Sequence, residues 1–117
     1  MWKWLERKLQ RAQSQSLWSV AILDDNIVTT DGMGAVRTIS IADLTSIVVA
    51  TDDSGPRGDD VVFLLYGGSE PLTIFPLEAH GCQDFVNWMA SKPGYHDREL
   101  AKAMASTRVA RFVVWTS

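Results

Sequence analysis

The sequence predicts one α+β domain. It combines an antiparallel, strongly bent sheet of about six to seven strands with an N-terminal amphipathic helix and two C-terminal helices before a final strand. The length of 117 residues fits a single hydrophobic core. As far as residue 75, short segments rich in β-branched residues alternate with turn formers. After Pro76 the spacing of apolar residues changes from two to 3.6, which indicates helices that follow the strands.

Residues 1–15 are expected to form the amphipathic helix, ahead of a domain that spans residues 16–117. Its apolar and basic side chains fall on different faces, with Trp2, Leu5 and Leu9 on one, Trp4 beside them, and Lys3, Arg7 and Arg11 on another. Such a helix can lie flat on an anionic membrane surface. The same apolar stripe can instead cover an edge or face of the protein's own sheet, or pair with a second copy of the chain.

The strands follow one another through short turns. Asp24, Asp25 and Asn26 separate the first two strands, and Asp31–Gly34 precedes the third. Asp43 either caps a single helical turn or leads directly into the fourth strand, and β-branched residues favour the strand. The expected strands are Leu17–Leu23, Ile27–Thr30, Ala35–Ile41, Ser46–Thr51, Val61–Tyr66 and Pro71–Phe75.

Two helices and a last strand complete the chain. The first helix carries one apolar stripe formed by Cys82, Phe85, Val86 and Met89, and it ends at residues 92–94. Asp97 is placed to cap the second helix, and its inward residues are expected to be Leu100, Ala101 and Met104. Residues 112–115 return as the final strand.

Charge and composition exclude several classes of protein. The net charge is −3, and residues 1–11 hold four basic and one acidic side chain, which leaves seven basic and thirteen acidic side chains in the rest. An acidic body repels a phosphate backbone, so no nucleic-acid binding is expected. A single cysteine, no export signal and a longest bulky apolar run of six residues predict a cytoplasmic protein, or one peripheral to the inner membrane if the first helix binds lipid.

His80 and Cys82 could form a metal pair or a nucleophile with its base. A structural zinc site needs four ligands, and the chain has no second cysteine and only one other histidine, His96. Cys82 also belongs to an apolar stripe, where a thiol behaves as a small hydrophobic group. We therefore expect no metal, no cofactor and no catalysis, with a small thiol-dependent enzyme as the residual alternative.

An acidic loop covers residues 52–60. Two acidic doublets flank its central residues 55–58, which differs from the alternating ligands of a calcium loop and favours a solvated loop. The three tryptophans of the body, Trp18, Trp88 and Trp115, are expected in the core or partly buried rather than in a ligand cage.

Several short motifs from residue 52 onward resemble a group of short, uncharacterised bacterial proteins. They are Ser54-Gly55-Pro56, Asp60-Val61, Phe75-Pro76, Gly81, Pro93-Gly94-Tyr95, Ala103-Met104, Phe112 and Trp115. The resemblance implies a bacterial origin and a single domain, and no activity comes with it. The order of strands and helix is also similar to pleckstrin-homology-like modules. This chain differs from them by a second helix, a final strand and the lack of a basic loop cluster for phosphoinositides.

These observations predict a non-catalytic protein-interaction module that binds a partner protein through the sheet edge, the acidic loop or the N-terminal helix. The alternatives are a membrane-surface adaptor anchored by residues 1–11 and an immunity or inhibitor protein for a basic partner, whose association its acidic body would accelerate. The candidate interaction residues are Trp2, Lys3, Trp4, Arg7, Asp52, Asp53, Arg57, Asp59 and Asp60.

Overall fold

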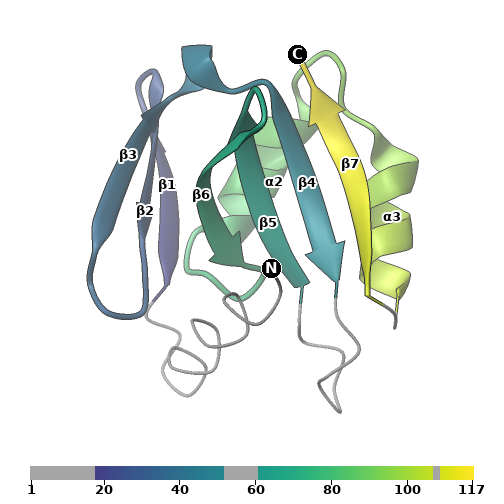
Figure 1. The fold of residues 1–117 in the computed structure, drawn as a ribbon, viewed down its shortest axis with the longest axis horizontal. Helices are drawn as coiled ribbons and strands as arrows, with labels where there is room; N and C mark the ends of the chain where they lie inside the picture. Colours follow the sequence, from purple (N-terminus) through teal and green to yellow (C-terminus); the bar gives the residue numbers. More distant parts are fainter. Residues whose placement is uncertain (1–17, 52–60, 107–108) are drawn as a thin grey trace.

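The computed structural model describes residues 18–51, 61–106 and 109–117. Within them, seven strands form two antiparallel sheets and two α-helices accompany them (Figure 1). The first sheet has the order β1-β2-β3, with β1 at Ser19–Leu23, β2 at Asn26–Thr30 and β3 at Val36–Ser40. The second has the order β6-β5-β4-β7, with β4 at Ser46–Thr51, β5 at Val61–Gly67, β6 at Glu70–Pro76 and β7 at Ala110–Thr116.

The three-stranded sheet is built from consecutive hairpins. Asp24 and Asp25 form the two-residue turn between β1 and β2, and Asp24 adopts a positive φ of 56°. Asp and Asn tolerate this backbone region better than other residues with a side chain. The second turn is held by Asp31, whose carboxylate accepts hydrogen bonds from the backbone N–H groups of Met33 and Ala35 at 2.8 and 2.9 Å.

The expectation of one strongly bent sheet is wrong, because the strands divide into two sheets that are not strongly curled. A 3-10 turn at Ile41–Asp43 lies between β3 and β4, and the Ser40 hydroxyl caps it by accepting from the Ala42 N–H at 3.3 Å. This turn carries the chain from one sheet to the other. Both neighbours of β4 are strands of the second sheet, β5 and β7, so β3 has no place beside it.

Strand β4 lies inside the four-stranded sheet and pairs with a neighbouring strand on each side. Val49 faces Phe63 of β5 on one side and Phe112 of β7 on the other. The final strand is therefore confirmed, and it closes a pairing between segments about sixty residues apart. All six residues of β4 except Ser46 are buried, as expected for a strand covered on both faces.

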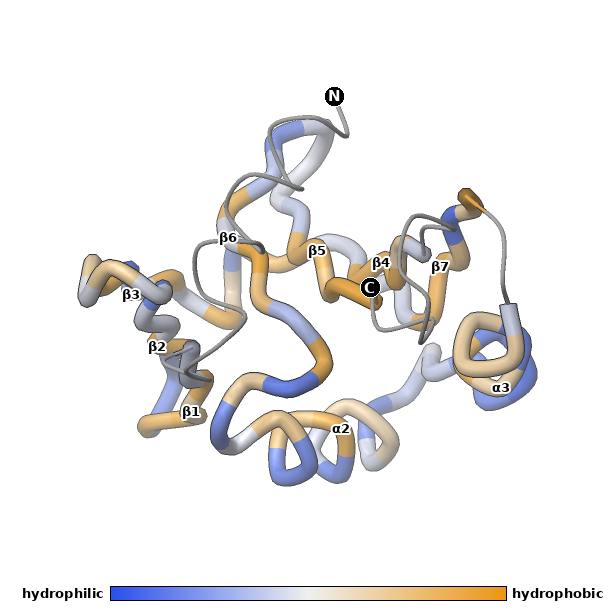
Figure 2. The backbone as a smooth tube through the Cα atoms, turned by 90° about the horizontal axis from the view of Figure 1, so that it is seen from below, coloured by the Kyte–Doolittle hydropathy of each residue, from blue (hydrophilic) through white to orange (hydrophobic). Residues whose placement is uncertain are grey.

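Both helices, α2 at Cys82–Ala90 and α3 at Asp97–Ala105, lie on the same side of the four-stranded sheet (Figures 1 and 2). Phe85 of α2 packs against Phe63 and Phe75, with ring centroids 5.7 and 4.9 Å apart, and all three rings are fully buried. Edge-to-face packing at these separations is favourable for aromatic rings. The apolar stripe expected for this helix is confirmed, since Cys82, Phe85 and Met89 are its buried residues.

The predicted inward face of α3 is partly wrong. Ala103 is the buried residue of this helix and Leu100 is half-buried, whereas Ala101 and Met104 are exposed. An alanine at the contact lets the helix lie close to the sheet, and this turns the longer Met104 toward solvent. The N-cap is His96 rather than Asp97, which forms the first residue of the helix.

Two expected features lie outside the described residues, namely the N-terminal helix at residues 1–15 and the acidic loop at residues 52–60. Among the helices that the structure describes, none is long and apolar enough to cross a bilayer.

Candidate functional site

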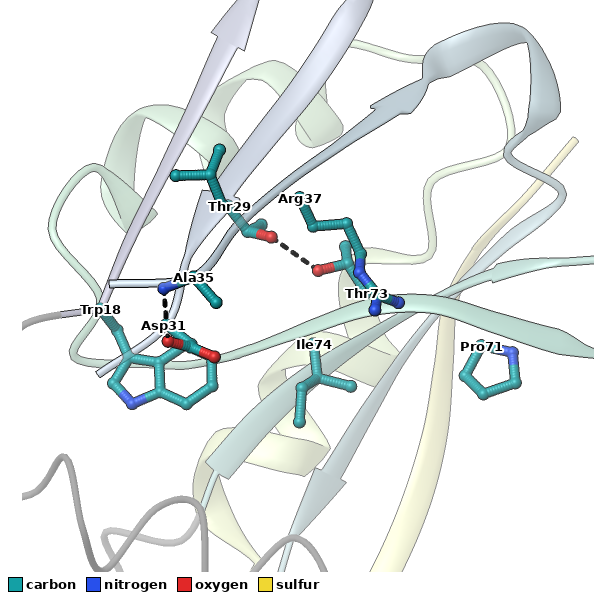
Figure 3. Close-up of a pocket in the computed structure, with 9 residues that line it drawn as sticks. Trp18, Thr29, Asp31, Ala35, Arg37, Pro71, Thr73 and Ile74 are labelled. Atoms are coloured by element: carbon teal, nitrogen blue, oxygen red, sulfur yellow. Dashed lines mark hydrogen bonds between the residues drawn. The ribbon is translucent and has the colours of Figure 1, made fainter. Parts of the chain in front are cut away.

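A cavity of about 190 Å³ lies where the edge of β6 meets the inner face of the three-stranded sheet (Figure 3). A cavity of roughly 150 Å³ holds a benzene molecule. This one therefore has room for about one large side chain. It is lined by Trp18, Thr29, Asp31, Ala35, Val36, Arg37, Pro71, Thr73 and Ile74.

Three polar side chains converge on one wall of the cavity. The hydroxyls of Thr29 and Thr73 are 2.7 Å apart and buried, and they join β2 to β6. Arg37 reaches across the same joint from β3 and donates from Nη1 to the Leu72 carbonyl oxygen at 3.0 Å. The two sheets are thus held together here by side chains, because no backbone ladder connects β6 with the first sheet.

Trp18 forms another wall and carries an unusual polar atom. Its side chain is buried, and its Nε1 has no hydrogen-bond acceptor among the described residues. A buried donor without an acceptor costs free energy, so such atoms are rare in folded proteins. In Figure 3 the indole nitrogen points away from the Thr29 and Thr73 hydroxyls, so it does not take part in that polar joint.

The outer edge of β3 carries backbone groups that no described residue pairs. The N–H of Ile41 donates to Asp25 and the N–H of Asp31 donates to Ala35 at the two ends of the β2–β3 ladder. Hydrogen-bonded pairs alternate along an antiparallel ladder. The N–H and C=O groups that point away from β2 are consequently those of Val36, Thr38 and Ser40.

Each of the other three sheet edges has at least one hydrogen-bond partner among the described residues. Along β1, the Val20 N–H donates to the His80 carbonyl oxygen at 2.9 Å and the His80 N–H donates to that of Trp18 at 2.8 Å. Along β7, the His96 N–H donates to the Val114 carbonyl oxygen at 2.8 Å. The edge of β6 faces the first sheet, and Arg37 donates a hydrogen bond to the carbonyl oxygen of Leu72 in β6.

Strand β3 thus differs from every other edge of the described structure. It lies at one end of the molecule (Figures 1 and 2), and it contains neither proline nor lysine. Its one charged residue is Arg37 on the inner face, a type of residue that also discourages edge pairing. Two large apolar side chains beside it are open to solvent, Met33 at 75% and Val36 at 65% exposure. Val36 and Arg37 also line the cavity, so the edge and the cavity form one continuous surface.

Cys82 and His80 do not form an activated pair. Burial, and secondly the charge of Glu78, raise the pKa of the Cys82 thiol to about 11. The thiolate is the nucleophilic form of cysteine, so a thiol with this pKa is unreactive at neutral pH. The expected packing role of Cys82 is confirmed by its burial at the start of α2.

The three tryptophans of the body are buried or half-buried, as expected. Two of them enclose a cation of the protein itself. Lys92 places its ammonium group 4.7 Å from the ring centroid of Trp88 and 5.1 Å from that of Trp115. Trp115 also donates from Nε1 to the Pro93 carbonyl oxygen at 2.8 Å. These contacts hold the turn between α2 and α3 against the sheet.

The structure does not describe any of the interaction residues expected from the sequence. Trp2, Lys3, Trp4 and Arg7, together with Asp52, Asp53, Arg57, Asp59 and Asp60, lie outside the described residues. The sequence also predicted binding through a sheet edge without saying which one. One feature of the sequence distinguishes the β3 edge. Met33 and Ala35 lie in the turn region before β3 and Val36 begins the strand, so an apolar group precedes a strand whose only charged residue is Arg37.

Within the described parts of the chain, no group of three or more His, Cys, Asp and Glu side chains is arranged to hold a metal ion. No protein-family model matches the sequence. No curated protein and no solved structure matches the chain either.

Proposed function

We propose that the protein is a non-catalytic interaction module that binds an extended segment of a partner protein along β3. The observation that carries this proposal is the unpaired outer edge at Val36, Thr38 and Ser40, the one edge of the described sheets that no described residue occupies. An added strand gains main-chain hydrogen bonds from such an edge, and pockets beside it select side chains.

The cavity supplies the selective part of this surface. Residues of β3 with odd numbers, Arg37 and Ile39, share the inner face of the sheet with Thr29. A strand added beside β3 would place every second side chain on that face, next to Arg37. One aromatic or branched aliphatic side chain fits the volume of about 190 Å³. The partner segment is therefore expected to alternate, with one large apolar side chain in phase with Arg37.

The test selects displayed random peptides on the wild-type chain and measures their binding to two variants at one position. Thr38→Pro removes an outward N–H that the ladder to β2 does not use, so the variant is expected to fold. Thr38→Val keeps this N–H and serves as the control. We expect the selected peptides to lose at least tenfold in affinity for Thr38→Pro and to retain their affinity for Thr38→Val.

Two results would contradict the proposal. One is that no peptide is enriched above the background of unrelated protein, and the other is that enriched peptides bind Thr38→Pro as tightly as the wild type. Amide hydrogen exchange gives an independent readout, because a bound strand should slow exchange at Val36, Thr38 and Ser40 and leave Ile39, already bonded to β2, unchanged.

A further inference from the structure

The four-stranded sheet has a second apolar face, opposite the one that α2 and α3 cover. Phe63 of β5 and Phe75 of β6 point toward α2, so the residues that alternate with them point to the other side. The central side chains of this outer face are almost completely buried, with exposures of 8% or less, and they are Val48, Ala50, Val62, Leu64 and Ile74.

No described helix or strand lies over this outer face. Figures 1 and 2 show both helices on the opposite side of the sheet and the three-stranded sheet beside it. At the β7 margin of the same face, Val113 is directly opposite Val48 and is 43% exposed. The centre of the face is therefore enclosed while its margin is open. Of the described side chains, Arg111, opposite Ala50, and Tyr66, opposite Ser46, contact each other across part of this face. We attribute the rest of the cover to residues outside the described part of the chain.

The composition of the remaining segments identifies that cover. Residues 52–60 read DDSGPRGDD and residues 107–108 are threonine and arginine, so neither offers a bulky apolar side chain. Bulky apolar side chains gain the most free energy by covering an aliphatic surface. Residues 1–17 are the one other segment, and they contain Trp2, Trp4, Leu5, Leu9 and Leu17.

The point at which this segment joins the fold supports the same assignment. Trp18, the first described residue, lines the cavity together with Ile74, which belongs to the outer face. The segment consequently leaves the described structure at the β6 side of that face. A helix of residues 1–15 would be about 22 Å long at 1.5 Å per residue, comparable to a strand of seven residues at roughly 23 Å.

We propose that residues 1–15 dock on the outer face of the four-stranded sheet through Trp2, Leu5 and Leu9, with Lys3 and Arg7 directed to solvent. The apolar stripe is then part of the fold and not a surface for lipid. This inference does not depend on partner binding at β3, which uses the other sheet.

The test labels single added thiols with a maleimide in the full-length chain. Val48→Cys probes the centre of the outer face, and Val113→Cys, its cross-strand neighbour, is the matched exposed control. The native Cys82 is buried and its thiol has a raised pKa of about 11, so it contributes little background labelling in the folded protein. We expect Val48→Cys to label at least tenfold more slowly than Val113→Cys.

Substitutions in the first segment then identify the cover. Leu5→Glu with Leu9→Glu should raise the labelling rate of Val48→Cys toward that of Val113→Cys, whereas Lys3→Gln with Arg7→Gln should leave it unchanged. A variant that has unfolded is recognised because Cys82 also labels. In that case the single Leu9→Ala replaces the double substitution, with a severalfold increase expected.

Each of the following results would overturn the assignment. Equal labelling rates of Val48→Cys and Val113→Cys in an otherwise unchanged chain would mean that the face is open. This result needs no substitution in residues 1–15. Protection that persists after the leucine substitutions assigns the cover to another segment or to the Arg111–Tyr66 pair. Protection that disappears on dilution assigns it to a second copy, and protection that requires anionic vesicles assigns it to lipid.

Discussion

Replacement of Thr29 and Thr73 by valine tests the joint between the two sheets. Both side chains are buried, at 3% and 7% exposure, and their hydroxyls are 2.7 Å apart. Valine keeps the shape of threonine and removes the hydroxyl. A single substitution leaves the partner hydroxyl buried without its bond, and this costs about 1–3 kcal/mol. The cavity beside Thr29 gives water some access to the remaining hydroxyl, so we expect the lower half of that range.

The double variant carries the decisive information. Removing both hydroxyls leaves no unpaired polar group, so its free energy of unfolding should lie within about 1 kcal/mol of the wild-type value. The two substitutions should thus be non-additive, with a coupling energy of about 2–3 kcal/mol. Urea unfolding at equilibrium measures all four proteins, and equal m-values confirm that they lose the same buried surface. Additive losses would refute the reasoning, because they would mean that the hydroxyls do not depend on each other.

Three further predictions follow from the core. Phe85→Ala should lower the free energy of unfolding by about 3–5 kcal/mol in the same urea assay, because it opens a space among rings with no solvent exposure; a loss below 1 kcal/mol would contradict the packing. Gly81→Ala should prevent stable folding, measured by circular dichroism, since a Cβ at this φ of 87° would lie 2.2 Å from the Val20 carbonyl oxygen; a native melting curve would show that the close approach is absent. The pKa of the Cys82 thiol rises from 9.0 to about 11 in the folded state. The stability that this shift adds to the folded protein is fully present below pH 9 and is lost as the pH rises to 11. Cys82→Ala should therefore lose less stability than the wild type over this range, by up to about 3 kcal/mol, and parallel pH profiles of the two proteins would exclude the effect.

Local structure was predictable because it depends on neighbouring residues. The turn at Asp24 and Asp25 and the apolar stripe of α2 each depend on residues within one short segment, and the structure confirms both. The division into two sheets does not depend on any one short segment. Val36 and Ile39 of β3 have the β-branched character of Ile47 in β4, and no property of a strand alone says which other strand will pair with it.

The candidate site was less accessible from the sequence for the same reason. Thr29, Arg37 and Thr73 come from three strands and two sheets, and none of them is unusual in its own segment. Expectation instead favoured charged and aromatic clusters that are contiguous in the chain. In α3, hydropathy favoured Met104 over Ala103, but close packing selected the smaller side chain.

The construction of the joint between the sheets also bears on the order in which the protein folds. The three-stranded sheet uses only contacts between near neighbours in the chain, whereas β4 must find β7 across about sixty residues. Local contacts form faster than distant ones, because less chain entropy is lost in closing the loop. The main described contacts between the three-stranded sheet and the rest of the protein are side-chain hydrogen bonds and the two backbone hydrogen bonds at His80. We therefore expect residues 19–40 to unfold and refold locally as one cooperative unit, at a lower free energy than global unfolding.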